Sequence, residues 1–220
     1  MVPSSQFIHR RQACPHIVCR EVFGKPLVAQ LIEFIGRRKS DFGPTYVRDR
    51  SSGKNRVDAD LRSSLGLGDL GPFREPLDAY VRGIAGSALA RLSLTEPSVE
   101  PRDFQVTAFR DGDRFGAHID TDDRLTRVRI LSCVYYFAAE PRRFSGGELR
   151  LYGLPALSAD GVRGFVDVMP ETDTMVIFPS WLRHEVLPVR VPSGEWAHSR
   201  FTLNCWLHRA AANGVSASAS

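Results

Sequence analysis

The second half of the sequence is a series of short strand-like segments separated by turn residues, and this pattern limits the possible folds more than any other feature. Each segment is apolar or alternates apolar with polar residues, and Gly, Pro, Asp and Ser punctuate the series. The expected strands are residues 104–110, 115–118, 128–137, 148–152, 164–168, 174–178, 185–191 and 201–207. Eight short strands predict a double-sheet jelly roll, the architecture also used by cupins.

Two segments of the first half have apolar residues at helical spacing. Leu27, Leu31 and Ile35 share one face of residues 25–39, and Leu77 and Val81 do the same in residues 75–94. Both segments are expected to be amphipathic helices that pack one face against the sheet. The predicted fold class is therefore mainly β (α+β), with supporting helices N-terminal to the strands.

A chain of 220 residues can bury a complete core, so a single domain is expected. Residues 1–100 are predicted to provide the helical support, and residues 101–209 the strand-rich core. Residues 210–220 are rich in Ala and Ser and are expected to be disordered. Residues 40–71 are rich in Gly, Ser, Asp and Arg, which indicates either a lid or substrate loop or an ordinary surface connection.

Composition argues against several classes of protein. Hydrophobic residues are 43% and charged residues 25% of the chain, as in ordinary globular proteins. No apolar run reaches the roughly 18 residues that a spanning helix needs, so no membrane association is expected. The N-terminal segment lacks the apolar centre of a secretory signal, and the cysteines are too sparse for a disulfide framework. These features favour a cytoplasmic protein with free thiols.

The charge distribution argues against a nucleic-acid partner. The net charge is +4, but the basic residues are spread along the chain without a cluster or interleaved aromatic residues. Nearly all of them are arginines, a skew that we attribute to genomic base composition. The sequence gives no indication of the oligomeric state.

Two histidines and a carboxylate form a candidate metal site. His118 and Asp120 are two residues apart, so they share a face if the strand that begins near residue 115 extends that far. His184 follows an apolar strand and a Pro/Ser turn, which can bring it back across the barrel. Two histidines and one carboxylate are the ligands of non-haem Fe(II) sites, which keep three coordination positions open. An isolated His-x-Asp pair is more often a surface pair, so the surrounding motifs carry the prediction.

An arginine lies on the same face of a strand as several polar residues. Alternation places Arg200, Thr202, Asn204 and Trp206 on one side of the last expected strand. An inward arginine without an anion costs several kcal/mol, and a ligand carboxylate would satisfy its planar guanidinium. The alternative is an outward Arg200 paired with an acidic side chain.

Five motifs, taken together and in order, carry a family resemblance. They are H-I-D at 118–120, V-Y-Y-F at 134–137, S-G-G-E-L at 145–149, F-P-S-W-L-R-H-E-V-L-P-V at 178–189 and R-F-T-L-N-C-W at 200–206. Residues 104–208 thus resemble the catalytic domain of the prolyl 4-hydroxylase-like branch of Fe(II)/2-oxoglutarate-dependent dioxygenases. The resemblance implies a double-stranded β-helix.

The resemblance also implies roles for individual residues. His118, Asp120 and His184 would be the catalytic metal ligands for Fe(II). Residues that would bind the cosubstrate 2-oxoglutarate are Arg200 and Thr202 at its distal carboxylate, and Tyr136, Ser132 and Val134 along the pocket. Tyr136 could instead be a packing residue. The substrate contacts suggested by the sequence are residues 40–71 and Asp122, Arg124, Trp181, Arg183 and Trp206, each of which could equally be a surface or packing residue.

The implied activity is hydroxylation of an unactivated C–H bond with O2 and 2-oxoglutarate, releasing succinate and CO2, with ascorbate as an optional reductant. A prolyl, peptidyl or amino-acid substrate is favoured. One alternative is a natural-product tailoring oxygenase that hydroxylates, desaturates or cyclises a small molecule. A more distant alternative is a cupin-like metal-binding module without oxygenase activity.

Asp120, Trp206 and Phe109 refine the resemblance. Asp120 argues against the halogenases of the family, which replace this carboxylate with a small residue. Trp206 stands where nucleic-acid demethylases carry a second arginine, so base repair is disfavoured. Phe109 occupies a position where related hydroxylases commonly have a tyrosine, which removes one hydrogen bond to the cosubstrate. The Gly146-Gly147 pair is expected to be a turn without a catalytic duty.

Overall fold

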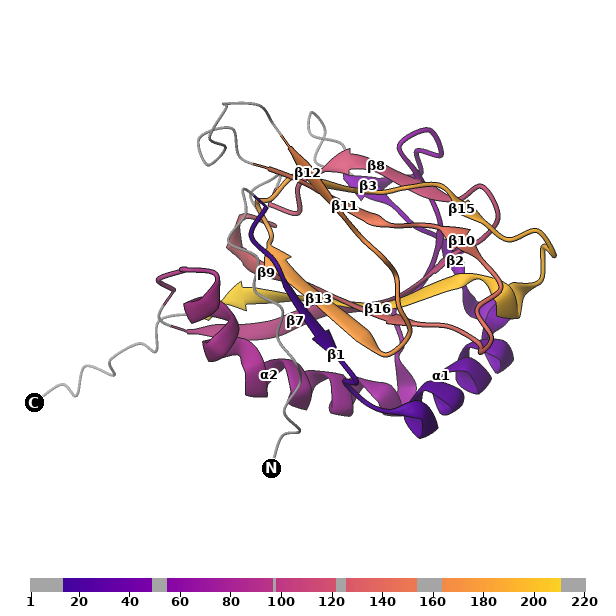
Figure 1. The fold of residues 1–220 in the computed structure, drawn as a ribbon, viewed down its shortest axis with the longest axis horizontal. Coiled ribbons are helices and arrows are strands. Elements are labelled where there is room, and N and C mark those ends of the chain that lie inside the picture. Colours follow the sequence, from indigo (N-terminus) through magenta and orange to yellow (C-terminus); the bar gives the residue numbers. More distant parts are fainter. Residues whose placement is uncertain (1–13, 49–54, 97, 122–125, 154–163, 211–220) are drawn as a thin grey trace, which may run out of the picture.

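The computed structural model describes residues 14–48, 55–96, 98–121, 126–153 and 164–210. A seven-stranded antiparallel sheet forms its main layer (Figure 1). The strands, in spatial order, are β1 (Ile17–Arg20), β13 (Thr174–Pro179), β9 (Arg129–Phe137), β16 (Arg200–Arg209), β7 (Val99–Phe109), β6 (Leu65–Leu67) and β2 (Gly43–Pro44). The long strands β7, β9 and β16 occupy its centre.

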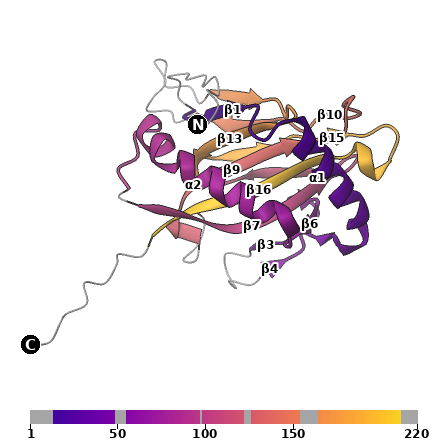
Figure 2. The same ribbon diagram turned by 90° about the horizontal axis from the view of Figure 1, so that it is seen from below.

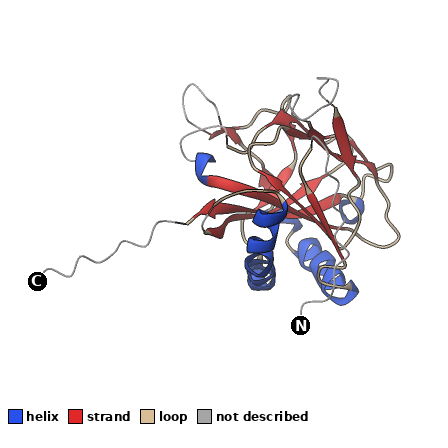
Figure 3. Cartoon of the chain, turned by 60° about the vertical axis from the view of Figure 1, so that its left-hand side comes forward, coloured by secondary structure: helices blue, strands red, loops and turns tan. Residues whose placement is uncertain are grey.

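A second sheet of five strands faces the first across the interior of the domain (Figure 1 and Figure 3). Its order is β12 (Phe165–Val168), β11 (Leu149–Tyr152), β14 (His184–Val186), β8 (Arg114–His118) and β5 (Arg62–Ser63). Two further strand pairs are β10 (Ser145–Gly146) with β15 (Val189–Arg190), and β3 (Val47–Arg48) with β4 (Asn55–Arg56). The two facing sheets confirm the predicted mainly-β jelly roll.

Two helices cover the outer face of the main sheet, as Figure 2 shows. They are α1 (Lys25–Arg37) and α2 (Arg74–Arg91), and both predicted helices are thereby confirmed within a few residues at each end. Their apolar faces join the main core, in which Leu31, Ile35, Leu77, Val81 and Tyr135 are almost completely buried. No helix in the described part of the chain combines the length and apolar character needed to cross a membrane.

The alternation of side chains along β9 and β16 divides the main sheet into two functional faces. Toward the helices, the two strands contribute Leu131, Cys133, Tyr135, Phe137, Phe201, Leu203, Cys205 and Leu207 to the core. Toward the second sheet they present Ser132, Val134, Tyr136, Arg200, Thr202, Asn204 and Trp206, which line a cavity. The face predicted for Arg200, Thr202, Asn204 and Trp206 is therefore observed.

The first hundred residues contribute strands as well as helices, which the sequence did not indicate. β1, β2 and β6 extend the main sheet at its two edges, and β5 extends the second sheet. β2, β3, β4, β5 and β6 lie within residues 40–71, which therefore form more than a connecting loop. The expected strand at residues 185–191 is divided into β14 and β15, because Pro188 lacks the N–H that a continuous ladder requires. The expected disordered tail lies almost wholly outside the described residues.

The start of α1 is tied to the main sheet by one carboxylate. Asp173, directly before β13, accepts hydrogen bonds from the backbone N–H of Phe23 at 2.8 Å and of Gly24 at 2.9 Å. It also accepts one from the Tyr135 hydroxyl at 2.9 Å. Asp173 has a left-handed backbone with φ of 58°, a conformation that Asp and Asn tolerate better than most residues. The carboxylate thus links the helix, β9 and β13.

We predict that Asp173→Asn lowers the free energy of unfolding by about 1–2 kcal/mol, because the amide nitrogen cannot accept one of the three bonds. Asparagine keeps the left-handed backbone tolerable, so backbone strain does not enter the comparison. Urea denaturation followed by circular dichroism measures the difference. The control is Asp167→Asn, whose carboxylate forms an ion pair with Arg150 on the surface and should cost less. Equal losses in the two variants would contradict the anchoring role.

Candidate active site

A cavity of about 700 Å³ lies between the two sheets. Its walls come from the inward faces of β7, β9 and β16 on one side and of β8 and β14 on the other. Near one wall lie His118, Asp120 and His184, and deeper along β16 lies Arg200. The candidate metal ligands and the candidate cosubstrate residues predicted from the sequence therefore open into the same space.

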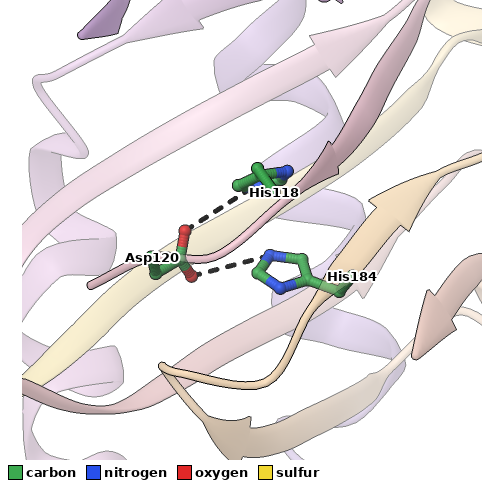
Figure 4. A group of neighbouring side chains, drawn as sticks. All are labelled: His118, Asp120 and His184. Carbon is green, nitrogen blue, oxygen red and sulfur yellow. Dashed lines mark ion pairs between the residues drawn. The ribbon is translucent and has the colours of Figure 1, made fainter. Parts of the chain in front are cut away.

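The structure brings His118, Asp120 and His184 together from two strands and a following turn (Figure 4). His118 ends β8 and pairs with His184, the first residue of β14. The closest ligand atoms are His118 Nε2 and Asp120 Oδ1 at 3.5 Å, and His184 Nε2 and Asp120 Oδ2 at 3.7 Å. All three ligand atoms lie within 4.8 Å of one another, a grouping that one metal ion can bridge.

Backbone carbonyls orient both imidazole rings. His118 Nδ1 lies 2.8 Å from the carbonyl oxygen of Gly116, and His184 Nδ1 lies 2.8 Å from that of Leu182. A carbonyl only accepts hydrogen bonds, so each Nδ1 carries the proton and each Nε2 presents a lone pair toward Asp120. Hydrogen bonding of this kind fixes the tautomer in many metal sites.

Electrostatics keep the site ready for a cation. Burial opposes ionisation of Asp120, but His184, His118 and the Ser132 hydroxyl outweigh it and hold the pKa of Asp120 below its ordinary value. Burial, reinforced by His118, lowers the pKa of His184 to about 4. Near neutral pH the carboxylate is therefore ionised and His184 is neutral, which are the protonation states that metal ligation requires.

Arg200 is a buried positive charge that forms no ion pair among the described residues, and the nearby charge of Glu148 offsets only part of the cost of its burial. Its side chain is only 1% exposed, and its Nε and Nη1 atoms have no hydrogen-bond partner among the described residues. The guanidinium lies between the rings of Phe109 and Tyr136, 4.9 Å from each centroid. Burial lowers the pKa of Arg200, because a charge removed from water is destabilised. The alternative of an outward, paired Arg200 is not what the structure shows.

Other unsatisfied or available donors surround this guanidinium. The Tyr136 hydroxyl is buried without a partner among the described residues, and burial raises its pKa, so it carries its proton. Thr202 Oγ1 accepts a hydrogen bond from Asn204 Nδ2 at 3.1 Å and keeps its own proton to donate. A carboxylate placed here would satisfy Arg200, Tyr136 and Thr202 together, so these residues fit the distal end of 2-oxoglutarate.

Ser132, expected along the cosubstrate pocket, and Phe109, expected to leave out one hydrogen bond to the cosubstrate, each have a further neighbour. The Ser132 hydroxyl donates to Asp120 Oδ2 at 2.6 Å, so it faces the candidate metal ligand. Phe109 pairs with Arg200 across β7 and β16 and packs its ring near the guanidinium. The ring of Phe109 thus contacts the arginine, where a tyrosine would offer the cosubstrate a hydrogen bond. Val134 lines the cavity as predicted.

Gly147 is a functional position that the sequence analysis missed. Its φ is +69°, and a Cβ atom at this position would lie 2.6 Å from Arg200 Cδ and 2.8 Å from Val189 Cγ2. A side chain would therefore displace the stem of the arginine. Gly146 is equally confined, since a Cβ would meet the backbone oxygen of Pro188 at 2.3 Å. The sequence signal for this packing was the Gly146-Gly147 pair, because glycine is used where another segment approaches the backbone closely as well as in turns.

The predicted substrate contacts divide into three groups. Trp206 lines the cavity, and its indole N–H donates to Asp120 Oδ2 at 2.9 Å. Trp181 and Arg183 are exposed in the turn before β14 and are not among the side chains that line the cavity. Asp122 and Arg124 lie outside the described residues. Residues 40–71 contribute Arg62 to the cavity wall, and Arg129 lines it too, although the sequence gave no reason to single out Arg129.

We predict that Gly147→Ala weakens 2-oxoglutarate binding at least tenfold, because the new methyl group forces Arg200 to move. Calorimetric titration of the Mn²⁺-loaded protein measures the affinity without turnover. The matched control is Gly164→Ala, a position with ordinary φ and open space around its Cβ, which should bind normally. If both variants bind as tightly as the wild type, Arg200 does not hold the ligand.

Comparison with known proteins identifies relatives of this core. A family model described as the 2OG-Fe(II) oxygenase superfamily matches residues 104–208. An uncharacterized PKHD-type hydroxylase of Synechocystis sp. (strain ATCC 27184 / PCC 6803 / Kazusa) is 39% identical over 123 residues, which are 55% of this chain and 41% of the relative. The match thus spans about two fifths of the length of that curated relative.

Two solved structures have a similar fold. A prolyl hydroxylase from Trichoplax adhaerens, in complex with a hypoxia inducible factor peptide fragment, superposes with a TM-score of 0.64 at 17% identity, over 88% of this chain and 83% of the other. A prolyl-4-hydroxylase from Pseudomonas putida gives a TM-score of 0.59 at 24% identity, over 89% and 94%. The likeness in fold and the family match over the same strands agree. Residues 104–208, which carry the His118, Asp120 and His184 group and Arg200, thus match the 2OG-Fe(II) oxygenase superfamily within a fold shared with prolyl hydroxylases.

Proposed function

We propose that this protein is an Fe(II)- and 2-oxoglutarate-dependent oxygenase that hydroxylates a C–H bond of a prolyl or other peptidyl substrate. One observation carries the proposal: a single cavity holds both a His/Asp/His group and a buried arginine that forms no ion pair among the described residues. A cupin-like metal-binding module would have no need of Arg200, whose burial without a counter-charge is unfavourable. An enzyme that binds a carboxylate beside its metal does need it.

His118, Asp120 and His184 would hold the iron through one atom each, which leaves positions for the cosubstrate and O2. The iron, when bound with 2-oxoglutarate and O2, supplies the oxidation, with release of succinate and CO2. The protein groups bind, orient and exclude water. Carbonyls of Gly116 and Leu182 keep both histidines in the ligating tautomer.

Arg200, Tyr136 and Thr202 would bind the distal carboxylate of 2-oxoglutarate in a buried part of the cavity. All three side chains are about 1% exposed, so water is largely excluded from the charge pair they would form. Charge pairs are stronger in such surroundings, and a bidentate guanidinium also fixes direction. The keto-acid end would then point along the cavity toward Asp120. Ser132 and Val134, also proposed from the sequence, would contribute to this passage.

A peptide substrate is supported by the relatives and by the wall near the metal group. The Synechocystis relative is named a PKHD-type hydroxylase, and the two solved structures are named prolyl hydroxylases. The cavity wall around Trp206 contains Gln105, Arg129, Asn204 and His208. These polar side chains suit the carbonyl and amide groups of a peptide backbone. Trp206 and residues 40–71, of which Tyr46, Val47 and Arg62 line the cavity, are the substrate contacts we retain.

A cytoplasmic location stays a prediction. The four cysteines are buried free thiols, in keeping with the reducing compartment expected from their sparse spacing.

We predict that the purified protein releases succinate from 2-oxoglutarate in the presence of Fe(II), O2 and ascorbate, and that one class of prolyl peptide stimulates the release. Mass spectrometry should find that peptide heavier by one oxygen atom. His118→Ala should abolish both signals by removing a ligand. His198→Ala is the matched control, because His198 contacts Ser193 and Glu195 and does not line the cavity.

The panel should include free amino acids and small cyclic molecules, since a tailoring oxygenase would respond to those instead of to peptides. Stimulation by a small molecule alone would replace the substrate class and leave the oxygenase assignment intact. Succinate release no higher than that of His118→Ala under every condition would overturn the oxygenase proposal.

A further inference from the structure

The two oxygen atoms of Asp120 have different surroundings. Oδ2 accepts two hydrogen bonds, from the Ser132 hydroxyl at 2.6 Å and from the Trp206 indole N–H at 2.9 Å. Each oxygen also faces one imidazole, Oδ1 that of His118 at 3.5 Å and Oδ2 that of His184 at 3.7 Å. Beyond these contacts, Oδ1 has no hydrogen-bond donor among the described residues, so the two donors set Oδ2 apart. The torsion that rotates a carboxylate about its Cβ–Cγ bond is intrinsically broad. Ser132 and Trp206 therefore determine which carboxylate oxygen is engaged in hydrogen bonds and which remains available to a metal ion.

The sheet delivers both donors to the same atom. Ser132 on β9 and Trp206 on β16 are direct cross-strand partners, and both side chains point into the cavity. The backbone of Asp120 is held separately, because its N–H donates a hydrogen bond to the Ser180 carbonyl at 2.9 Å. Two donors on adjacent central strands thus converge on a carboxylate whose backbone is fixed independently.

The direction of each proton follows from the chemistry of the groups. Ser132 Oγ lies 3.0 Å from Ser180 Oγ as well as 2.6 Å from Asp120. An ionised carboxylate only accepts, so Ser132 donates to Asp120 and Ser180 donates to Ser132. In such a series of hydrogen bonds, each bond polarises the next. The bond from Ser180 therefore strengthens the bond from Ser132 to Asp120 Oδ2.

A second set of charged groups braces the Trp206 ring. The Arg129 guanidinium lies 4.1 Å from the ring centroid, and Arg129 Nη2 pairs with Asp103 Oδ2 at 3.0 Å. His208 Nε2 contacts the same Asp103 oxygen at 3.0 Å. Asp103 has φ of 54° and lies where the pairing of β7 with β16 shifts register. Bulges of this kind often redirect side chains beside functional sites, and here the bulge places the Asp103 carboxylate against Arg129 and His208.

We propose that Trp206 and Ser132 are positioning residues for the metal: together they occupy Oδ2 of Asp120, so that this carboxylate offers Oδ1 alone to the ion. Arg129 acts through Trp206 by fixing its ring. This inference rests on the proposed metal-binding role of His118, Asp120 and His184. Its consequence is that Asp120 takes one coordination position. A carboxylate free to rotate could bind the ion through both oxygens and so occupy a position that the cosubstrate or O2 needs.

The test uses Co²⁺ as the probe, with affinity measured by competition against a fluorescent chelator and coordination followed by visible absorption. Trp206→Phe keeps an aromatic face for Arg129 but removes the indole N–H and one ring of the indole. Loss of an outer partner of a metal ligand weakens binding by about 10–100-fold, and we expect that range for Trp206→Phe and for Ser132→Ala. The Co²⁺ absorption of both variants should also change in shape, which a loss of stability alone would not produce.

Matched controls separate positioning from general damage. Trp196→Phe also loses an indole hydrogen bond, to the Ile35 carbonyl at 3.2 Å beside the helices, and should bind Co²⁺ like the wild type. Ser180→Ala removes the outer hydroxyl of the chain and should weaken binding less than Ser132→Ala does.

The outcomes distinguish this inference from the proposed function. If the wild type fails to bind Co²⁺, the metal site itself is wrong and the proposed function fails with it. If the wild type binds and Trp206→Phe matches Trp196→Phe in both affinity and spectrum, the metal site stands and the positioning role of Trp206 is refuted.

Discussion

The burial of the Arg200 guanidinium without an ion-pair partner in the described part of the chain is the constraint on which the rest of this site depends. A charge that is only 1% exposed is unfavourable unless an anion binds beside it. The neighbouring residues make the buried guanidinium tolerable before such an anion is bound. The rings of Phe109 and Tyr136 flank it, and Gly147 gives its stem room that no other residue would leave. The region is therefore complementary to a carboxylate, and the candidate metal ligands lie in the same cavity.

Strands β9 and β16 serve the core and the site at once, because alternate residues face opposite sides. Their helix-facing residues pack against α1 and α2, which holds the strands in register. The same register sets Trp206 opposite Ser132 and Thr202 opposite Tyr136 on the cavity side. The precision of the site thus comes from the central strands of the main sheet, and the second sheet supplies His118 and His184 from its own paired strands.

The sequence predicted the parts of this molecule whose signals are local. Strand alternation identified Arg200 and its face, and the His-x-Asp spacing identified ligands that the structure does bring together. What it missed depends on long-range contacts: β1 and β6 are short strands that join the sheet only through partners far along the chain. The packing of Gly147 on Arg200 and the hydrogen bond from Trp206 to Asp120 likewise depend on how distant segments meet. Ser132 was assigned to the cosubstrate because alternation gives the face of a residue but not its partner.

The most direct test of the account compares two ligands that differ only at the end expected to meet Arg200. Anaerobic Fe(II)-loaded protein is titrated with 2-oxoglutarate and with 2-oxopentanoate, which lacks the distal carboxylate, and the visible charge-transfer band is recorded. We predict strong preference for 2-oxoglutarate in the wild type, and loss of that preference in Arg200→Met but not in Arg209→Met, a surface arginine paired with Glu96. Equal binding of the two ligands by the wild type would contradict the central role given to Arg200.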